Sequence, residues 1–416
     1  MKSLVEKFNH KLTSDEAKLV VQLVEIAIMI VCAICVIVMT LRANQIKTMM
    51  EEHRLNRGNF DNIEALMLEI QDIYNKQYVG EHPNPEDLED MALAGFTAGY
   101  GDSYGAYLSP TNAEDLANER KEQLVGIGVQ IVYEGEVGFY VIQTYRGSSA
   151  NEVGIREGDY IISAGDVNCE DNTHDEMIEA IRGEEGTTVE LGIRRGDEEF
   201  KVTVERMDIK SESVRVKEVD DVGYIKVDQF TEHSSEEFIE YLEDFKSKGI
   251  DKFIIDLRNN SGGMADTVIN MIDYLIPEGL IVEFKCKDSS RDEEYYSDKF
   301  QFNGDIVVLI NNNSASASEL FSKALQDYGR AKIIGMKSYG KGTICTTYGL
   351  SNGGSLILST GKYHTISGDE IEGVGVTPDI EVKMKYADQK ILYKLAFEDD
   401  IQFKAAYKEL TGREYN

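Results

Sequence analysis

The chain has 416 residues and a formal net charge of −32, with 43 basic against 75 acidic side chains. Its length indicates two or three domains, and its charge argues against a nucleic-acid surface, which would need clustered lysine and arginine. Of the five cysteines, two lie in an apolar run and three stand at unrelated spacings, so no disulfide framework is expected. The one CxxC spacing, Cys32 to Cys35, lies inside that apolar run, and neither it nor an HExxH pattern offers a metal site, so we expect neither a metal nor another cofactor.

An apolar segment near the N-terminus is the first element of the chain. Residues 19–41 are predominantly apolar and match the roughly 20 residues that cross a bilayer as a helix. The residues after it lack the small-x-small cleavage pattern of a signal peptide, so we predict an uncleaved transmembrane anchor behind a short tail, residues 1–18. A buried core helix is the alternative. Basic residues flank the segment on both sides, so charge alone leaves its orientation open.

Residues 42–117 are predicted to form a stalk and an N-terminal helical region. The segment opens with a charged stretch, and residues 62–78 then repeat apolar side chains at helical spacing. After a proline-containing break, a second helix is predicted over residues 85–98, followed by an aromatic-rich turn over residues 101–110. Such helices leave the formation of a homo-oligomer open.

Residues 118–207 predict a domain of short strands around one helix. The strands are expected over residues 126–131, 138–143, 160–164, 188–194 and 199–205, and the helix over residues 174–182. This pattern resembles a PDZ domain. The N–H groups of Gly126, Ile127, Gly128 and Val129 would bind the C-terminal carboxylate of a peptide that extends the following strand edge. A glycine hairpin within a generic β domain is the alternative.

From residue 208 to residue 385 the pattern changes to that of an α/β core. Predicted strands and helices alternate over residues 223–227, 235–247, 252–257, 264–275, 305–310, 316–328 and 332–335. This alternation indicates a mostly parallel sheet with crossover helices. Residues 339–365 are richer in Gly, Ser and Thr and predict antiparallel strands, and residues 386–416 are predicted to be a C-terminal helical region.

The junction after the predicted strand at residues 305–310 carries the strongest chemical signal. A serine in the alternating Ser/Ala run at residues 314–318 would project its hydroxyl from a sharp turn beside unpaired N–H groups. An acyl-transfer enzyme uses such groups to hold an oxyanion. Lys341 lies between two glycines, 25 residues after Ser316, and would supply a base. From the residues alone, the two other serines of the run compete with Ser316.

The turn after the predicted strand at residues 252–257 is a second candidate part of this site. It ends in Gly262 and Gly263, and glycine lets a backbone approach a ligand closely and adopt positive φ. The N–H of Gly262 or Gly263 would provide one oxyanion donor and that of Ala317 the other. A simple strand-to-helix turn with a polar cap is the alternative.

Together these motifs resemble the carboxyl-terminal processing peptidases, the tail-specific or S41-type family, over about residues 60–385. The resemblance rests on Asp102…Tyr104…Tyr107-Leu108-Ser109-Pro110, the PDZ-like insert, Asp256-Leu257-Arg258-Asn259-Asn260-x-Gly-Gly, Ser314-Ala315-Ser316-Ala317-Ser318-Glu319 and Gly340-Lys341-Gly342-Thr343. It implies an α/β fold with a crotonase-like core and an inserted PDZ-like β-rich domain, to which the residues themselves add the N-terminal helical segment and one transmembrane helix. It also implies an extracytoplasmic location, so we expect a single-pass protein of the cell membrane with its N-terminus in the cytoplasm and its catalytic domain outside.

By the same resemblance, Ser316 matches the nucleophile and Lys341 the general base of a Ser-Lys dyad. Gly262 or Gly263, together with Ala317, matches the oxyanion hole. A lysine that acts as a base has to be uncharged. Burial among apolar groups favours the uncharged form, and an adjacent carboxylate opposes it. No acidic residue lies within five positions of the lysine.

One position departs from the family pattern. Relatives carry a glutamine four residues after the lysine, where this chain has Cys345. Because a thiol is a poor hydrogen-bond acceptor, we predict reduced activity, a substitute partner such as Thr343 or Thr346, or regulation through the thiol. Asp327 matches an acid of the family, and we interpret it as structural because it lies 11 residues from the serine, about 16 Å along a helix.

The sequence therefore predicts a membrane-anchored serine endopeptidase that captures the C-termini of proteins or peptides and cleaves with a Ser-Lys dyad. The alternative is a PDZ scaffold on a degenerate protease core, with Cys345 as the mark of lost catalysis. A crotonase-type acyl-CoA enzyme is disfavoured, because it has no use for a carboxylate-binding insert. The expected partners are exposed protein C-termini and the membrane, with no nucleic acid.

Overall fold

A computed structural model describes residues 60–121 and 123–415, in two units that divide after residue 84. The predicted membrane helix over residues 19–41 and the charged stretch after it lie outside the described residues. Among the residues that are described, no helix is both long and apolar enough to cross a bilayer. The first unit contributes α3, Phe60–Gln77, which confirms the helix predicted there.

The second unit begins with α4, Pro85–Ala98, whose bounds are those of the predicted helix. The aromatic-rich turn leads into β1, Ala106–Leu108, and then into α5, Pro110–Arg120, which was not predicted. The Ser109 hydroxyl caps this helix by accepting a hydrogen bond from the N–H of Asn112 at 3.2 Å. The proline that follows has no N–H to leave unpaired, which favours a helix start at this position.

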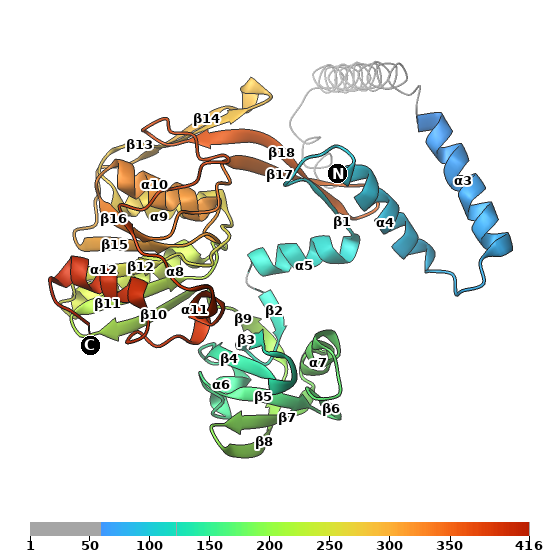
Figure 1. The fold of residues 1–416 in the computed structure, drawn as a ribbon, viewed down its shortest axis with the longest axis horizontal. Coiled ribbons are helices and arrows are strands. Elements are labelled where there is room, and N and C mark those ends of the chain that lie inside the picture. Colours follow the sequence, from blue (N-terminus) through green and yellow to red (C-terminus); the bar gives the residue numbers. More distant parts are fainter. Residues whose placement is uncertain (1–59, 122, 416) are drawn as a thin grey trace, which may run out of the picture. The chain divides into compact units, whose positions relative to one another are not determined.

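The β-rich insert forms one sheet in the order β3-β4-β5-β7-β8, with β6 paired to β5 (Figure 1). Its elements are β3 Val129–Tyr133, β4 Phe139–Thr144, α6 Ser149–Glu152, β5 Tyr160–Ala164, β6 Val167–Asn168, α7 His174–Ile181, β7 Thr188–Arg195 and β8 Glu198–Glu205. Strands β2, Gln123–Gly126, and β9, Met207–Lys210, pair antiparallel where the chain enters and leaves the insert. Val141, Met177 and Leu191 are among its fully buried core residues.

The following domain is built on a six-stranded sheet in the order β10-β11-β12-β15-β16-β19. Its strands are β10 Val214–Val219, β11 Val222–Val227, β12 Lys252–Asp256, β15 Asp305–Ile310, β16 Ala331–Gly335 and β19 Ile380–Glu381. Every neighbouring pair is parallel except β10 and β11. Its helices are α8 Ser234–Ser247, α9 Ala265–Leu275, α10 Ala317–Asp327 and α12 Ile401–Thr411. The predicted α/β alternation is confirmed.

Both faces of this sheet are buried, which explains why its strands read as continuous apolar runs. In β12, Phe253 and Ile255 belong to the core that contains residues of α8, α9 and α10. Ile254, between them, belongs to the core that contains Phe403 and Tyr407 of α12. Successive side chains of a strand point to opposite faces, so α12 covers the face that the other three helices leave open.

The parallel strands bring three polar turns to one edge of the sheet. The register pairs Asp256 with Leu309 and Ile310 with Gly335, so β12, β15 and β16 end side by side. The turns that follow these strands contain the glycine pair, the serine run and the lysine loop. Open α/β sheets bind their ligands at the carboxyl ends of the strands. The candidate site therefore lies at the edge where such folds place ligands.

A second, antiparallel sheet adjoins the lysine loop, with the order β1-β18-β13-β14 and with β17 on β18 (Figure 1). Its further strands are β13 Gly279–Cys286, β14 Glu293–Ser297, β17 Thr343–Gly349 and β18 Ser355–His364. The antiparallel strands predicted over residues 339–365 are confirmed. Pairing of β1 with β18 anchors the aromatic-rich turn that precedes β1 against this sheet.

Two predicted elements differ from the structure. The strand predicted over residues 126–131 is interrupted between β2 and β3 at Gly128, which has a φ of +81° that only glycine adopts without strain. The C-terminal region is not one helix but α11 Tyr386–Lys390, a 3₁₀ turn Leu392–Lys394, and α12. Asp400 starts α12 afresh because its carboxylate accepts the N–H groups of Gln402 and Phe403, each at 3.0 Å.

Candidate active site

Ser316 occupies a strained turn between β15 and α10. Its φ of +55° is in the left-handed region, where side chains other than glycine are strained. The other two serines of the run are fully buried and donate their hydroxyls to backbone carbonyls, Ser314 to Leu257 at 2.8 Å and Ser318 to Asn260 at 2.9 Å. Only the middle serine of the three is half-exposed.

A buried carboxylate, Glu319, links the serine turn to the lysine loop. Its Oε2 atom accepts the N–H of Ser316 at 2.8 Å and the N–H of Lys341 at 2.7 Å. Its Oε1 atom accepts the hydroxyl of Ser338 at 2.5 Å and the N–H of Gly340 at 2.6 Å. A fully buried carboxylate with four donors is a strong positional restraint, because hydrogen bonds to an ionised acceptor are the stronger kind.

Tyr363 provides a second link between the same two segments. Its hydroxyl lies 3.0 Å from the carbonyl oxygen of Ser316 and 2.8 Å from that of Lys341, and its single proton is shared between them. Burial raises the pKa of this phenol well above its ordinary value, so it remains a donor at any working pH. The backbones of the serine and the lysine are thus held together by one carboxylate and one phenol.

The Lys341 side chain is half-buried, and its ammonium lies over the ring of Tyr104, 4.7 Å from the ring centroid. The Tyr104 hydroxyl donates to Glu372 at 3.1 Å. The other oxygen of Glu372 accepts the N–H of Gly342 at 2.9 Å and the hydroxyl of Thr343 at 2.7 Å. The same carboxylate therefore anchors both the aromatic ring and the loop that carries the lysine.

The glycine turn approaches Ser316 closely. A Cβ at Gly262 would lie 2.8 Å from the Cβ of Ser316 and 3.1 Å from the nitrogen of Ala317, so only glycine fits there without movement. The N–H of Gly262 is already bound to the side chain of Asn260 at 2.8 Å. Within the described part of the chain, the N–H groups of Gly263 and Ala317 have no hydrogen-bond acceptor. Of the two predicted glycine donors, Gly263 is the one with a free N–H.

A buried charge network supports this turn from the strand side. Arg258 is fully buried and contacts the carboxylates of Asp256 at 2.6 Å and Asp400 at 2.8 Å. The Lys226 ammonium donates to the carbonyl of Arg258 at 2.5 Å. Burial opposes the ionisation of Asp256, but the charges of Arg258 and Lys226 more than offset it and hold the pKa of Asp256 well below its usual value. The turn is thus fixed by the ionised pair of Arg258 and Asp256.

Cys345 lies in β17 opposite Ser359 of β18. Burial raises the pKa of its thiol, the positive charge of Lys341 opposes that shift, and the side chain of Ser359 is a hydrogen-bond partner. The two residues proposed as substitutes for the missing glutamine have partners elsewhere, because Thr343 donates to Glu372 and Thr346 pairs with Thr360 at 2.7 Å. The thiol therefore occupies the position of the missing glutamine and lies within range of the Lys341 charge.

Asp327, interpreted as structural, makes structural contacts. It accepts the Thr365 hydroxyl at 2.6 Å and pairs with Lys323 at 2.6 Å. Sequence reasoning missed Tyr363 and Glu372, which have no signal in their local sequence. Glu319 had one, because a Glu three residues after a Ser at a helix start is the pattern of a capping box.

The loop between β2 and β3 forms the candidate peptide cradle of the insert. The carbonyls of Ile127 and Gly128 accept hydrogen bonds from Ala150 and Tyr145, both at 2.9 Å. The N–H groups of Ile127 and Gly128 have no acceptor among the described residues. Gly126 pairs with Met207 as the last residue of β2, and Val129 begins β3. Two of the four predicted positions therefore present free consecutive donors.

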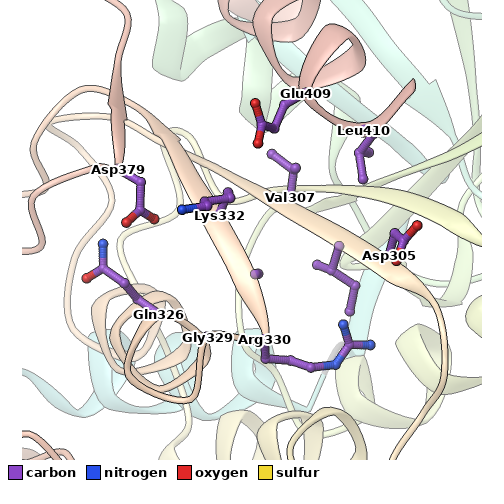
Figure 2. A pocket seen from close by; sticks show the side chains of 11 residues that line it. Asp305, Val307, Gln326, Gly329, Arg330, Lys332, Asp379, Glu409 and Leu410 are labelled. Carbon is purple, nitrogen blue, oxygen red and sulfur yellow. The ribbon is translucent and has the colours of Figure 1, made fainter. Parts of the chain in front are cut away.

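A pocket of about 310 Å³ lies at the opposite edge of the six-stranded sheet and contains none of the predicted site residues (Figure 2). Asp305 and Lys332, near the starts of β15 and β16, line it together with Asp379 and Glu409. The Arg330 guanidinium at its floor already donates to three backbone carbonyls. This mixed-charge pocket is separate from the serine and lysine turns.

Comparison with known proteins places these features in a family context. Residues 221–382 match peptidase family S41, and residues 115–194 match the PDZ domain. The chain is 30% identical over 399 residues to a carboxy-terminal-processing protease of Bartonella bacilliformis, covering 86% of this chain and 91% of that protein. It is also 30% identical over 361 residues to a probable CtpA-like serine protease of Staphylococcus aureus, covering 86% of this chain and 71% of the relative.

Among solved structures, a protein from Bacteroides fragilis assigned to the S41 proteases shares the fold. The TM-score is 0.54 at 17% identity, and the match covers 82% of this chain and 94% of the other. A likeness at this level of identity concerns the fold alone. It agrees with an α/β core that carries a PDZ domain.

Proposed function

Because this chain belongs to peptidase family S41, the carboxyl-terminal processing serine peptidases, and carries a PDZ domain, we propose that it cleaves protein tails with a Ser316–Lys341 dyad. One observation carries the assignment of these two residues. The carboxylate of Glu319 and the hydroxyl of Tyr363 each bond to the backbones of both. Two independent restraints on the same pair are what a preorganised nucleophile and base require.

In the proposed reaction the Ser316 hydroxyl oxygen attacks the carbonyl carbon of the scissile peptide bond. Its proton passes to the uncharged amine of Lys341, and the carbonyl oxygen becomes an oxyanion. The free N–H groups of Gly263 and Ala317 stabilise that charge. The lysine then gives its proton to the leaving amine as the C–N bond breaks. Water hydrolyses the resulting acyl-enzyme by the same proton transfers in reverse order.

The PDZ domain is proposed to supply the tail recognition. The consecutive free N–H groups of Ile127 and Gly128 suit a C-terminal carboxylate, and the substrate would continue as an added strand along β3. A net charge of −32 disfavours strongly acidic tails, so substrates with apolar or basic tails fit best.

The membrane placement is part of the same proposal. The apolar residues 19–41 would anchor the protein in the cell membrane, with the N-terminus in the cytoplasm and the peptidase outside. Substrates would then be proteins with C-termini accessible at that membrane surface. The exposed apolar side chains of α3 leave assembly into a homo-oligomer open.

A catalytically inactive PDZ scaffold is the second candidate. The contact between the Lys341 ammonium and Tyr104 favours it, because a lysine in that position is not bonded to Ser316. The glutamine expected beside the lysine is also absent, with Cys345 in its place.

Cleavage of matched substrates distinguishes the two candidates. The full-length chain is incubated with an unfolded reporter protein whose apolar tail ends in a free carboxylate or in an amide. We expect cleavage of the free-carboxylate reporter, several-fold slower cleavage of the amidated one, and none by Ser316→Ala. Tail-dependent binding without cleavage by the unmodified chain would establish the scaffold instead.

A further inference from the structure

We infer that Tyr104 is a positioning residue that holds Lys341 in its charged form at rest and so sets the pH at which the peptidase becomes active. This inference deepens the proposed function, on which it rests. It starts from the one contact that the lysine ammonium makes in the described part of the chain, a position 4.7 Å from the centroid of the Tyr104 ring. A cation at this distance over an aromatic face is attracted by the negative charge of the ring face.

The aromatic ring is itself fixed. Its hydroxyl donates to Glu372 at 3.1 Å, and Glu372 also accepts the N–H of Gly342, the residue after the lysine. Burial and this hydrogen bond raise the pKa of Tyr104 to about 12, so the ring stays a neutral phenol at working pH. The backbone before the ring is held as well, because Asp102 accepts the N–H of Tyr104 at 3.1 Å. Hydrogen bonds therefore hold the Tyr104 ring in the position where it contacts the ammonium.

Four other titratable groups lie around the lysine, and one of them, Tyr363, bonds the lysine's carbonyl oxygen and stays a neutral phenol. Glu319 of α10 accepts its backbone N–H, Glu372 approaches from the loop after β18, and Cys345 faces it from β17. Neither carboxylate forms an ion pair with the ammonium among the described residues, because both are engaged with N–H and O–H donors. Tyr104 is thus the group in direct contact with the charge.

The contact has a direct chemical consequence. A cation–π contact stabilises the ammonium but not the uncharged amine, and only the uncharged amine takes the proton from Ser316. The resting position therefore opposes catalysis. To act, the lysine has to lose its proton and leave the ring for the serine. Weakening the ring's attraction should move the onset of activity to lower pH, by roughly half to one and a half pH units.

The first test measures the lysine without requiring catalysis. In the full-length Ser316→Ala chain, Lys341 is labelled with trinitrobenzenesulfonate, which reacts with uncharged amines, and the labelled peptide is quantified by mass spectrometry across pH. Tyr104→Leu should shift the midpoint of labelling to lower pH relative to Tyr104→Phe, which keeps the ring and loses the same hydrogen bond to Glu372. Lys332, exposed at the opposite edge of the sheet, is the internal reference.

The second test keeps the shape of the side chain in case Tyr104→Leu does not fold. Phenylalanine analogues with increasing ring fluorination at position 104 weaken the attraction for a cation while preserving the ring's size. The acid limb of the pH–rate profile for reporter cleavage should move stepwise to lower pH along the series. Tyr107→Phe, in β1 just after that turn, removes a hydroxyl bonded to Asp90 of α4 and should leave the acid limb in place.

Each failure has its own signature. Suppose that Ser316→Ala and Lys341→Ala abolish cleavage, but that changes to the ring at position 104 alter neither the pH midpoint of Lys341 labelling nor the acid limb of the pH–rate profile. The inference about Tyr104 is then wrong, and the Ser316–Lys341 dyad stands. If the pH midpoint of Lys341 labelling shifts with the ring at position 104 but Lys341→Ala still cleaves the reporter, the dyad is wrong and the contact between Lys341 and Tyr104 stands. An upward shift with weaker rings contradicts the inference outright.

Discussion

The Oε2 atom of Glu319 accepts the backbone N–H of Lys341 at 2.7 Å, across 22 residues of sequence. The same atom accepts the N–H of Ser316 at 2.8 Å. The strained serine turn and the lysine loop are therefore held at a fixed separation by one oxygen. The geometry of the proposed dyad thus depends on a residue that does not itself take part in the proposed reaction.

Glu319→Gln tests this dependence. The glutamine amide has one acceptor oxygen, and its NH₂ group would face two of the four donors that now bind the carboxylate. Leaving two buried donors unpaired should lower the free energy of unfolding by about 2–5 kcal/mol. Activity should fall by more than the loss of folded protein explains. Urea unfolding and turnover of the same preparations give both quantities.

Glu370→Gln is the matched control for that substitution. Glu370 is an exposed carboxylate paired with Lys362 at 2.8 Å on the surface. Exposed pairs contribute little to stability, so neither unfolding nor turnover should change measurably. If the two variants behave alike, Glu319 does not have the role assigned to it.

Gly262→Ala tests the close approach of the glycine turn to the serine. The added methyl group would lie 2.8 Å from the Cβ of Ser316, so the serine or the turn has to move. A displacement of this size at reacting atoms costs on the order of 100-fold in rate. Gly249→Ala has a similarly positive φ, +83°, but open space around its Cβ. It should lose roughly 1 kcal/mol of stability and keep its rate, and equal rate losses in both variants would refute the argument.

Cys345→Gln should raise turnover. The glutamine oxygen would accept a hydrogen bond from the uncharged amine of Lys341, which the thiol does poorly. One such bond contributes about 1 kcal/mol, or roughly five-fold in rate. Cys345→Ala, which has no acceptor, should stay near the unmodified chain. The steady-state rates at which the unmodified chain, Cys345→Gln and Cys345→Ala cleave one reporter check this prediction. A lower rate for Cys345→Gln than for Cys345→Ala would contradict it.

The thiol of Cys345 should alkylate slowly at neutral pH. Burial raises its pKa above the ordinary value of 9.0, so at pH 8 less of it is thiolate than in an unfolded chain. Iodoacetamide reacts with the thiolate, and its rate at Cys345 should therefore rise only at pH values above those that activate the same cysteine in urea. Mass spectrometry of the Cys345 peptide in the folded and the unfolded chain measures the difference. Faster alkylation in the folded chain would show that the charge of Lys341 outweighs burial.

The α/β domain was predictable because each of its signals is local. The apolar runs of β12 and β15 are continuous because both faces of the sheet are covered. The serine run and the glycine pair follow those strands directly, and parallel pairing brings them to one edge. The helix predicted over residues 316–328 differs from α10 by one residue at each end, because its start and its apolar spacing are also local signals.

What the sequence did not reveal depends on contacts distant along the chain. Tyr104 reaches Lys341 only because β1 pairs with β18, some 250 residues later. Tyr363 and Glu372 reach the site from β18 and the loop after it, and nothing in their local sequence marks them. Nor could spacing distinguish Gly262 from Gly263, because the choice depends on the Asn260 side chain, which occupies the N–H of the first.

Covalent trapping of the nucleophile would identify Ser316 as the reacting serine. The full-length chain, Ser316→Ala and Lys341→Ala are each exposed to a fluorophosphonate, and the modified residue is identified by peptide mass alongside reporter cleavage. We expect modification at Ser316 and cleavage in the unmodified chain, and neither in the two variants, although both remain folded. Cleavage at an undiminished rate by Lys341→Ala, or modification at Ser314 or Ser318 instead, would contradict this expectation.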